Sequence, residues 1–184
     1  IHLDTLLSLQ NPKTDFPDEN IFIIYHQITE LFFKLCLIEI EHINNNGRHV
    51  IDTGQDLGWH QFLTIDLFIE KLKRINRYLD NLINSFNIMI EGMDRDQFLK
   101  FRMALLPSSG FQSVQFRMIE LQSTDLNNLV KNATKSKSGV SYEKIYWKRE
   151  ANDLDTGKKT YMLKQFEKKY DERLTKVYKK MKTK

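Results

Sequence analysis

The sequence predicts an all-α protein, a helical bundle with long helices. The chain has 184 residues but only three prolines and seven glycines, so few helix-breaking residues interrupt it. Apolar residues recur at helical spacing over long stretches, whereas almost no stretch alternates as a strand would. Hydrophobic residues make up 41% and charged residues 28%, which is typical of globular proteins, and the length suits one domain.

The first part of the chain is expected to be an arm followed by a long helix. Residues 1–17 form the arm, because Pro12 and Pro17 interrupt any regular structure there. The helix is expected from an N-cap at Asp18 to about Asn45, with Gly47 as its C-cap. Its apolar positions at near-helical spacing are Phe22, Leu31, Leu35, Ile38 and Ile43.

The middle of the chain continues the bundle. A second long helix is expected from about residue 59 to 91, from Trp59 to the residue before Gly92. "DRDQ" at 94–97 has the form of a capping box, so a helix is expected from there to Leu106. "SVQFRMIELQS" predicts one more helix. Residues 18–130 are thus interpreted as the helical core that carries any site.

The last third is polar at first and then helical. Residues 131–160 have weak periodicity and are interpreted as a polar insertion, partly ordered by Tyr142, Ile145, Tyr146 and Trp147. Residues 161–184 predict a basic amphipathic helix. Its apolar stripe consists of Leu163, Phe166, Tyr170, Leu174, Val177 and Met181.

The charge is distributed unevenly. Residues 131–184 hold 17 Lys/Arg against 7 Asp/Glu, a net of +10, whereas residues 1–130 hold 11 against 17, a net of −6. A basic region can bind nucleic acid. Here lysines alternate with acids and no nucleic-acid motif occurs, so a solvated basic face, or one that docks within its own assembly, is favoured. No nucleic-acid partner is therefore expected.

Two further features concern the cellular compartment. No run of about 18 apolar residues occurs, so no membrane span is expected. Cys36 is the only cysteine, which excludes an intrachain disulfide and favours the reducing cytoplasm.

A histidine interrupts the apolar stretch "FIIYHQITELFFK" at residues 22–34. Taken alone, His26 is best interpreted as a core histidine with satisfied ring nitrogens. A second stretch, "FLKFRMALLPSSGFQSVQFR" at 98–117, changes this view. Phe98 and Arg102 are four residues apart and share a helix face, and the following Pro-Ser-Ser-Gly turn offers further anion donors. Arg102 either snorkels or binds an anion, and this combination indicates a carboxylate pocket.

At these residues the sequence resembles the tryptophan 2,3-dioxygenases. "FIIYHQITEL" matches that family's "FII-x-HQ-x-x-EL", and "FRMALLPSSGFQSVQFR" matches its "FR-x-x-L-x-P-x-SGFQS-x-Q-[FY]-R". The resemblance covers about residues 1–130 well, and the later part is weaker.

The resemblance implies a haem b enzyme of the cytoplasm. Its partners are L-tryptophan and O2, and both oxygen atoms are added across the indole C2–C3 bond to give N-formylkynurenine, the first step of the kynurenine pathway. The family assembles as a homotetramer, a dimer of dimers. His26 matches the catalytic residue that hydrogen-bonds the indole N–H. The substrate-binding set is Phe22, His26, Phe98 and Arg102, and the cofactor-binding set is Phe22, Ser109 and Gly110.

The chain departs from the family in its missing iron ligand. None of the five histidines matches the family's proximal axial histidine, and the "GTGG" loop is absent, so no metal ligand is predicted. The chain is either part of a longer polypeptide or a short haem-free paralogue that binds tryptophan or indole. The intact set Phe22, His26, Phe98 and Arg102 favours the first interpretation.

Overall fold

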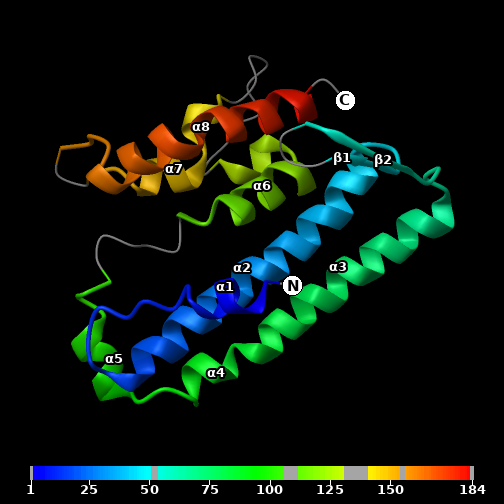
Figure 1. Cartoon of the computed structure of the whole chain (residues 1–184). Coiled ribbons are helices and arrows are strands. Elements are labelled where there is room, and N and C mark those ends of the chain that lie inside the picture. Colours follow the sequence, from blue (N-terminus) through cyan, green and yellow to red (C-terminus); the bar gives the residue numbers. More distant parts are fainter. Residues whose placement is uncertain (1, 51–53, 106–111, 131–140, 154–155, 183–184) are drawn as a thin grey trace. The chain divides into compact units, whose positions relative to one another are not determined.

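The computed structural model describes residues 2–50, 54–105, 112–130, 141–153 and 156–182 (Figure 1). It divides the chain into two compact units, Ile1–Leu106 and Pro107–Lys184. Helices dominate the described ranges, and a two-stranded sheet is the only sheet in them, so the all-α class is confirmed. The elements are α1 (Leu3–Leu7), α2 (Pro17–Asn44), β1 (Arg48–Val50), β2 (Asp56–His60), α3 (Ile65–Ser85), α4 (Asn87–Ile90), α5 (Arg95–Phe101), α6 (Val114–Ser123), η2 (Leu126–Leu129), η3 (Tyr142–Lys144), α7 (Tyr146–Glu150) and α8 (Tyr161–Lys182).

The frame of the first unit is the antiparallel pair α2 and α3, which lie side by side (Figure 1). Helix α2 begins after the extended residue Phe16, with Pro17 at the first helical position, where a missing N–H leaves no partner unsatisfied. The predicted N-cap at Asp18 is therefore wrong. Asp18 lies in the first turn, and its Oδ2 accepts a hydrogen bond from the backbone N of Asp94, 2.6 Å away.

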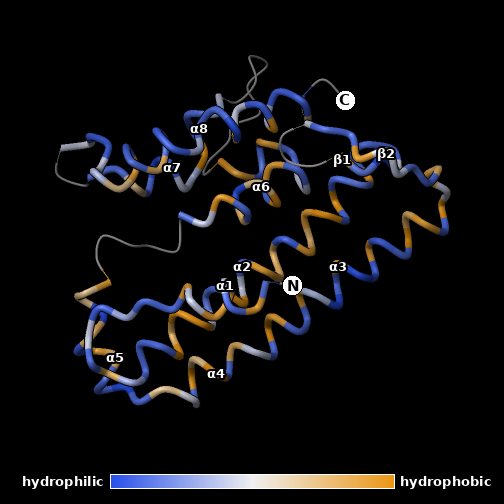
Figure 2. Tube along the Cα trace, viewed as in Figure 1, coloured by the Kyte–Doolittle hydropathy of each residue, from blue (hydrophilic) through white to orange (hydrophobic). Residues whose placement is uncertain are grey.

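The buried face of α2 differs from the expected one. Its buried apolar residues are Tyr25, Cys36, Leu37 and Ile40, whereas Leu31, Leu35 and Ile38 are about half exposed, at 53%, 41% and 39%. Hydrophobic residues recur along the whole of α2 (Figure 2), so its sequence does not single out one face. By length and composition alone α2 is apolar enough to cross a membrane, but the core helix of a soluble protein satisfies the same criterion. Its buried carboxylates, Glu19 and Glu39, both hydrogen-bond within the first unit.

An antiparallel hairpin of β1 and β2 follows α2. Arg48 pairs with His60 and Val50 with Asp56, with a register shift between them. The C-cap of α2 is Asn45 and not the predicted Gly47, because the left-handed residue Asn46, with φ +53°, already ends the helix; Gly47, with φ +83°, donates its N–H to the carbonyl of His42. A Cβ on Gly47 would lie 1.7 Å from the backbone oxygen of Gln61, so this position accepts only glycine.

The two following helices are shorter than predicted. Helix α3 starts at Ile65 and not at Trp59, because Asp56–His60 is strand; Thr64 caps it by accepting from the N–H of Leu67 at 3.2 Å. It ends at Ser85, and α4 makes a separate turn. Asp94 accepts from the N–H of Gln97 at 2.8 Å, which confirms it as the N-cap of α5. Helix α5 ends at Phe101 and not at Leu106.

The second unit packs α6 against α8, with η3 and α7 between them in sequence. Ser113 caps α6 by accepting from the N–H of Phe116 at 3.2 Å. The predicted stripe of α8 is confirmed in part, because Leu163, Phe166 and Leu174 are buried. Of the predicted ordered part of the insertion, Tyr142, Ile145 and Trp147 are buried; residues 131–140 lie outside the described residues.

A buried cation lies at the centre of the second unit. Lys148 is 3% exposed, and its Nζ lies 2.9 Å from carboxylate oxygens of Glu143 and Asp171 and 3.2 Å from Glu167. The same ammonium lies 4.3 Å from the centroid of the Tyr142 ring. Burial lowers the pKa of Lys148, but the three carboxylates outweigh it and the net shift is upward. Lys148 therefore stays charged and links η3 and α7 to α8.

The N-terminal arm lies on α2 of its own chain. Gln27 donates to the carbonyl of Leu9 at 3.0 Å and accepts from Gln10 at 2.6 Å. The carboxylate of Glu19, which is fully buried, accepts from the N–H groups of Lys13 and Thr14, both at 2.8 Å, and from the Thr14 hydroxyl. This carboxylate anchors the loop that joins the arm to α2.

The attachment of the arm should weaken in acid. Burial raises the pKa of Glu19, but the donors of Lys13 and Thr14 outweigh it, so the pKa lies below the usual 4.5. Stability from this group is therefore present above pH 4.5 and is lost as the pH falls through the lower folded value. We expect Glu19→Gln to cost about 1–3 kcal/mol of unfolding free energy at pH 7, and less in acid. Urea unfolding at several pH values measures this, and an equal cost at every pH would contradict it.

Candidate functional site

Helix α2 places an aromatic ring directly against the histidine of the first motif. Phe22 and His26 are one turn apart, and their ring centroids lie 4.1 Å from each other. The His26 ring also meets Tyr25 edge-on, with ring centroids 6.0 Å apart. His26 itself is exposed, so it is not the satisfied core histidine that its apolar neighbours in the sequence suggest.

The hydrogen bond of His26 fixes which ring nitrogen carries the proton. Its Nδ1 lies 2.7 Å from the backbone carbonyl oxygen of Phe22. A carbonyl can only accept, so Nδ1 carries the hydrogen and donates it. In the neutral ring Nε2 then keeps a lone pair. His26 is thereby held as a hydrogen-bond acceptor on an exposed face of α2.

Helix α5 brings further rings to the same place. The Phe98 centroid lies 6.1 Å from that of Phe22, although the two are distant in sequence. Phe101, which is fully buried, meets Phe22 at 6.0 Å and Phe98 edge-on at 5.5 Å. The sequence reasoning missed Phe101, although the spacing "FLKF" puts two aromatic residues three apart on α5. These rings form an aromatic cluster of Phe22, Phe98 and Phe101, with His26 at its edge.

Of the remaining predicted site residues, the structure describes Arg102 but not the other two. Arg102 is the C-cap of α5, its backbone N donates to the carbonyl of Phe98 at 2.9 Å, and its side chain is exposed. Among the described residues the structure brings Phe22, His26 and Phe98 together, and it gives the guanidinium of Arg102 no contact with them. Ser109 and Gly110 lie outside the described residues.

An apolar groove opens beside His26, between α2 and the end of α3. Its volume is about 420 Å³, which falls in the range of small-molecule sites. Phe86 forms part of its wall and packs against Tyr25, with ring centroids 6.2 Å apart. The lining residues are Tyr25, His26, Thr29, Leu82, Ile83 and Phe86. Apart from His26 and Thr29 this lining is hydrophobic or aromatic, so the groove suits a flat apolar ring that carries one hydrogen-bond donor.

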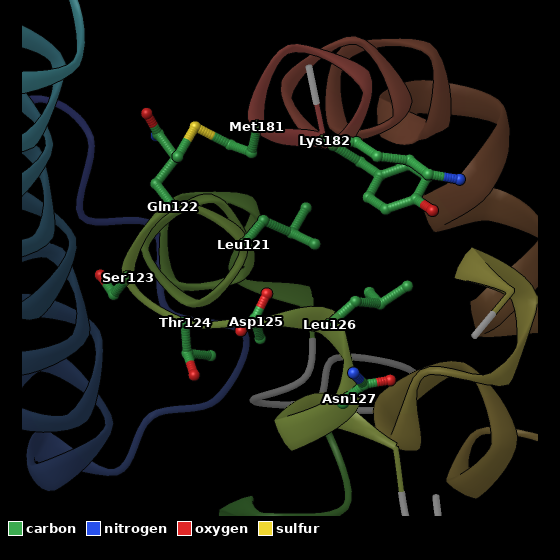
Figure 3. A pocket seen from close by; sticks show the side chains of 10 residues that line it. Leu121, Gln122, Ser123, Thr124, Asp125, Leu126, Asn127, Met181 and Lys182 are labelled. Carbon is green, nitrogen blue, oxygen red and sulfur yellow. The ribbon is translucent and has the colours of Figure 1, made fainter. Parts of the chain in front are cut away.

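A second cleft, of about 410 Å³, lies in the other unit where α6 and α8 end (Figure 3). Leu121, Leu126 and Met181 supply apolar surface, and exposed polar side chains such as Thr124 and Asp125 form its rim. None of the described residues predicted for the site lines it.

Comparison with known proteins agrees with the motifs. The family model for tryptophan 2,3-dioxygenase matches residues 1–181. A tryptophan 2,3-dioxygenase of Ruegeria sp. (strain TM1040) is 38% identical over 120 residues, which is 65% of this chain and 38% of that protein. The protein of the same name from Pseudomonas fluorescens is 36% identical over 64% of the chain and 37% of its own length. The one from Xenopus tropicalis is 32% identical over 65% of the chain and 29% of its own length.

The chain thus spans under two fifths of the length of these curated relatives, while the family model matches nearly all of it. Both motifs that carry the aromatic cluster and His26 lie inside the matched residues. The chain belongs to the tryptophan 2,3-dioxygenase family.

Proposed function

We propose that this chain supplies the substrate-facing part of a haem-dependent dioxygenase site that converts L-tryptophan and O2 into N-formylkynurenine. The observation that carries the proposal is the Nδ1–H bond from His26 to the carbonyl of Phe22. It presents Nε2 as an acceptor beside an aromatic cluster, and an indole offers a flat apolar ring with one N–H donor. The setting is a cytoplasmic homotetramer, as in the family.

The aromatic rings would shield the reacting part of the substrate from water. Phe101 is fully buried and Phe22 and Phe98 are partly buried, so together they form an apolar wall next to His26. The indole N–H would donate to Nε2 of His26, which orients the ring without requiring a strong base. His26 is in this sense the catalytic residue of the chain.

The residues present fit one face of a haem. Phe22 and Phe98, which pack on the buried Phe101, would offer the apolar surface that a porphyrin plane contacts, and Phe22, Ser109 and Gly110 are the residues assigned to it by the family motifs. When bound, haem supplies the oxygen chemistry of this family. No histidine of this chain corresponds to the family's axial ligand, so no residue here is assigned to the iron.

At the other end of the substrate, Arg102 would pair with the carboxylate. Its guanidinium is exposed and its planar fork can hold a carboxylate by two hydrogen bonds. Arg102 follows Phe98 by one turn, so carboxylate and ring contacts would come from the same helix, α5.

The test compares substrates with and without the indole N–H. Full-length protein reconstituted with haem should convert L-tryptophan to N-formylkynurenine and should bind 1-methyl-L-tryptophan more weakly. Loss of one hydrogen bond of about 0.5–1.5 kcal/mol corresponds to roughly 2- to 13-fold in affinity. His26→Ala should reduce the difference in affinity between L-tryptophan and 1-methyl-L-tryptophan, because Nε2 of His26 no longer accepts the indole N–H. His60→Ala, a histidine of β2, serves as the matched control and should leave it unchanged. Full-length protein that neither binds haem nor turns over tryptophan would overturn the proposal.

A further inference from the structure

A second histidine, His42, lies at a junction that the proposed dioxygenase site does not use. It is near the end of α2, and its ring centroid lies 4.7 Å from that of Trp59 on β2 and 5.8 Å from that of His49 on β1. Its Nδ1 lies 2.8 Å from Nζ of Lys71 on α3. One imidazole thus contacts α3 and both strands of the hairpin.

The partner of Nδ1 determines the state of the ring. The ammonium of Lys71, which is 3% exposed, also donates to the carboxylate of Glu39 at 2.8 Å. An ammonium has only donors, so Nδ1 of His42 must accept, and the ring is neutral with its hydrogen on Nε2. Nε2 is buried and has no hydrogen-bond partner among the described residues. The neutral ring is therefore held by Lys71 on one edge and by the tilted ring of Trp59.

We infer that His42 is a pH-sensitive latch for the β1–β2 hairpin. While neutral it stays docked between Lys71 and Trp59; once protonated it leaves Lys71, gives up the ring contact with Trp59 and loosens the hairpin. The reason is geometric, because a proton on Nδ1 would point at an ammonium 2.8 Å away and neither group could accept. The bond from the N–H of Gln61 to the carbonyl of Gly47 remains, so the opening is local.

The charges around His42 set the direction of its titration. Those that face it are Lys71 and Arg74 from α3, His49 from β1 and Glu39 from α2 itself. Burial lowers the pKa of His42 below its usual 6.5, the charge of Lys71 lowers it further, and Glu39 acts in the opposite direction. Just below pH 6.5 the imidazole of His42 binds a proton in the unfolded chain but stays neutral in the folded chain. The docked state thus loses stability as the pH falls from 6.5 toward the folded pKa.

Trp59 reports on the latch by fluorescence, since the chain has only two tryptophans. Titration of the whole chain from pH 8 to 4.5 should change the emission with a midpoint below 6.5, because the ring contact with His42 is lost. The change should be absent in Trp59→Phe, which leaves only Trp147, and in His42→Gln. His2→Gln, at an exposed histidine before α1, is the control and should keep it.

A second measurement separates the latch from a merely structural histidine. The imidazole of His42 is titrated by NMR in the wild type and in Lys71→Met, where the midpoint should rise as the adjacent cation is removed. If stranded Glu39 unfolds that variant, Lys71→Met/Glu39→Gln removes both charges, and its midpoint should lie nearer 6.5 than in the wild type. A wild-type midpoint at or above 6.5, an unchanged midpoint without Lys71, or a Trp59 transition that persists in His42→Gln overturns the inference.

Discussion

Replacing Arg102 by alanine is expected to lower kcat/KM for L-tryptophan by roughly 30-fold to several-thousand-fold in the haem-loaded, full-length protein. The substrate carboxylate would lose the cationic partner that Arg102 supplies at the end of α5. In a closed pocket this carboxylate would also remain desolvated. Stranding one side of such a pair costs about 2–5 kcal/mol. At about 1.4 kcal/mol per decade this gives the stated range. Steady-state kinetics measures it.

The size of the loss also tells how far the pocket closes. In this structure the Arg102 side chain is exposed, and an ion pair that stays open to water is worth only about 0.2–1 kcal/mol, up to roughly fivefold. Arg102→Lys should recover little, because an ammonium lacks the planar fork. Tryptamine has no carboxylate, so its kcat/KM should differ little between the wild type and Arg102→Ala. Arg95→Ala, at the start of α5, controls for general charge. A loss within about threefold for L-tryptophan would contradict the pairing of Arg102 with the carboxylate in a closed, desolvated pocket.

Replacing Lys148 by methionine should destabilise the second unit by about 3 kcal/mol. Removing the cation leaves three carboxylates facing one another, and breaking one side of a buried ion pair costs about 3–5 kcal/mol. The lower end applies because Glu143 and Asp171 are 58% and 37% exposed and can turn to water. Glu167, only 15% exposed, keeps a contact with Lys159 at 2.7 Å.

Urea unfolding in a Trp59→Phe background measures this effect, because Trp147 then reports on the second unit alone. Trp147 is 2% exposed and follows Tyr146 at the start of α7, next to Lys148. Lys159→Met is the matched control: this lysine contacts the same Glu167 but is 45% exposed, so its loss should cost less than about 1 kcal/mol. Equal costs for the two lysines would show that the burial of Lys148 contributes nothing.

Sequence alone predicted the part of the candidate site that depends on helical spacing. Phe22 and His26 are four residues apart, and so are Phe98 and Arg102, so each pair had to share one face of its helix. The structure adds that α2 and α5 bring Phe22 and Phe98 together. Spacing within one helix cannot supply this contact, because it depends on how two separate helices pack. The roles of these residues toward tryptophan stay predictions.

Where the sequence prediction was wrong, the local pattern was ambiguous. Helix α2 carries apolar residues on several faces, so spacing could not separate buried Leu37 and Ile40 from exposed Leu31 and Leu35. The strand Asp56–His60 is exposed throughout and contains a glycine, so it shows no alternation of buried and exposed positions. Phe101 was overlooked because its importance comes from two partners, one of them on α2.

The hydrogen bond from the Asp94 N–H to Asp18 fixes how α2 and α5 are rotated relative to each other. Asp18 lies one turn before Phe22, and Asp94 lies one turn before Phe98. The hydrogen bond therefore connects the two helices one turn before each of these rings. Each residue of an α-helix advances the side-chain direction by about 100°. One residue inserted or deleted within either of these first turns would therefore swing a ring out of the cluster. Changes of length in the connection before Asp94 leave both rings in phase, so chain-length variation is better tolerated there than in the two turns that carry the site.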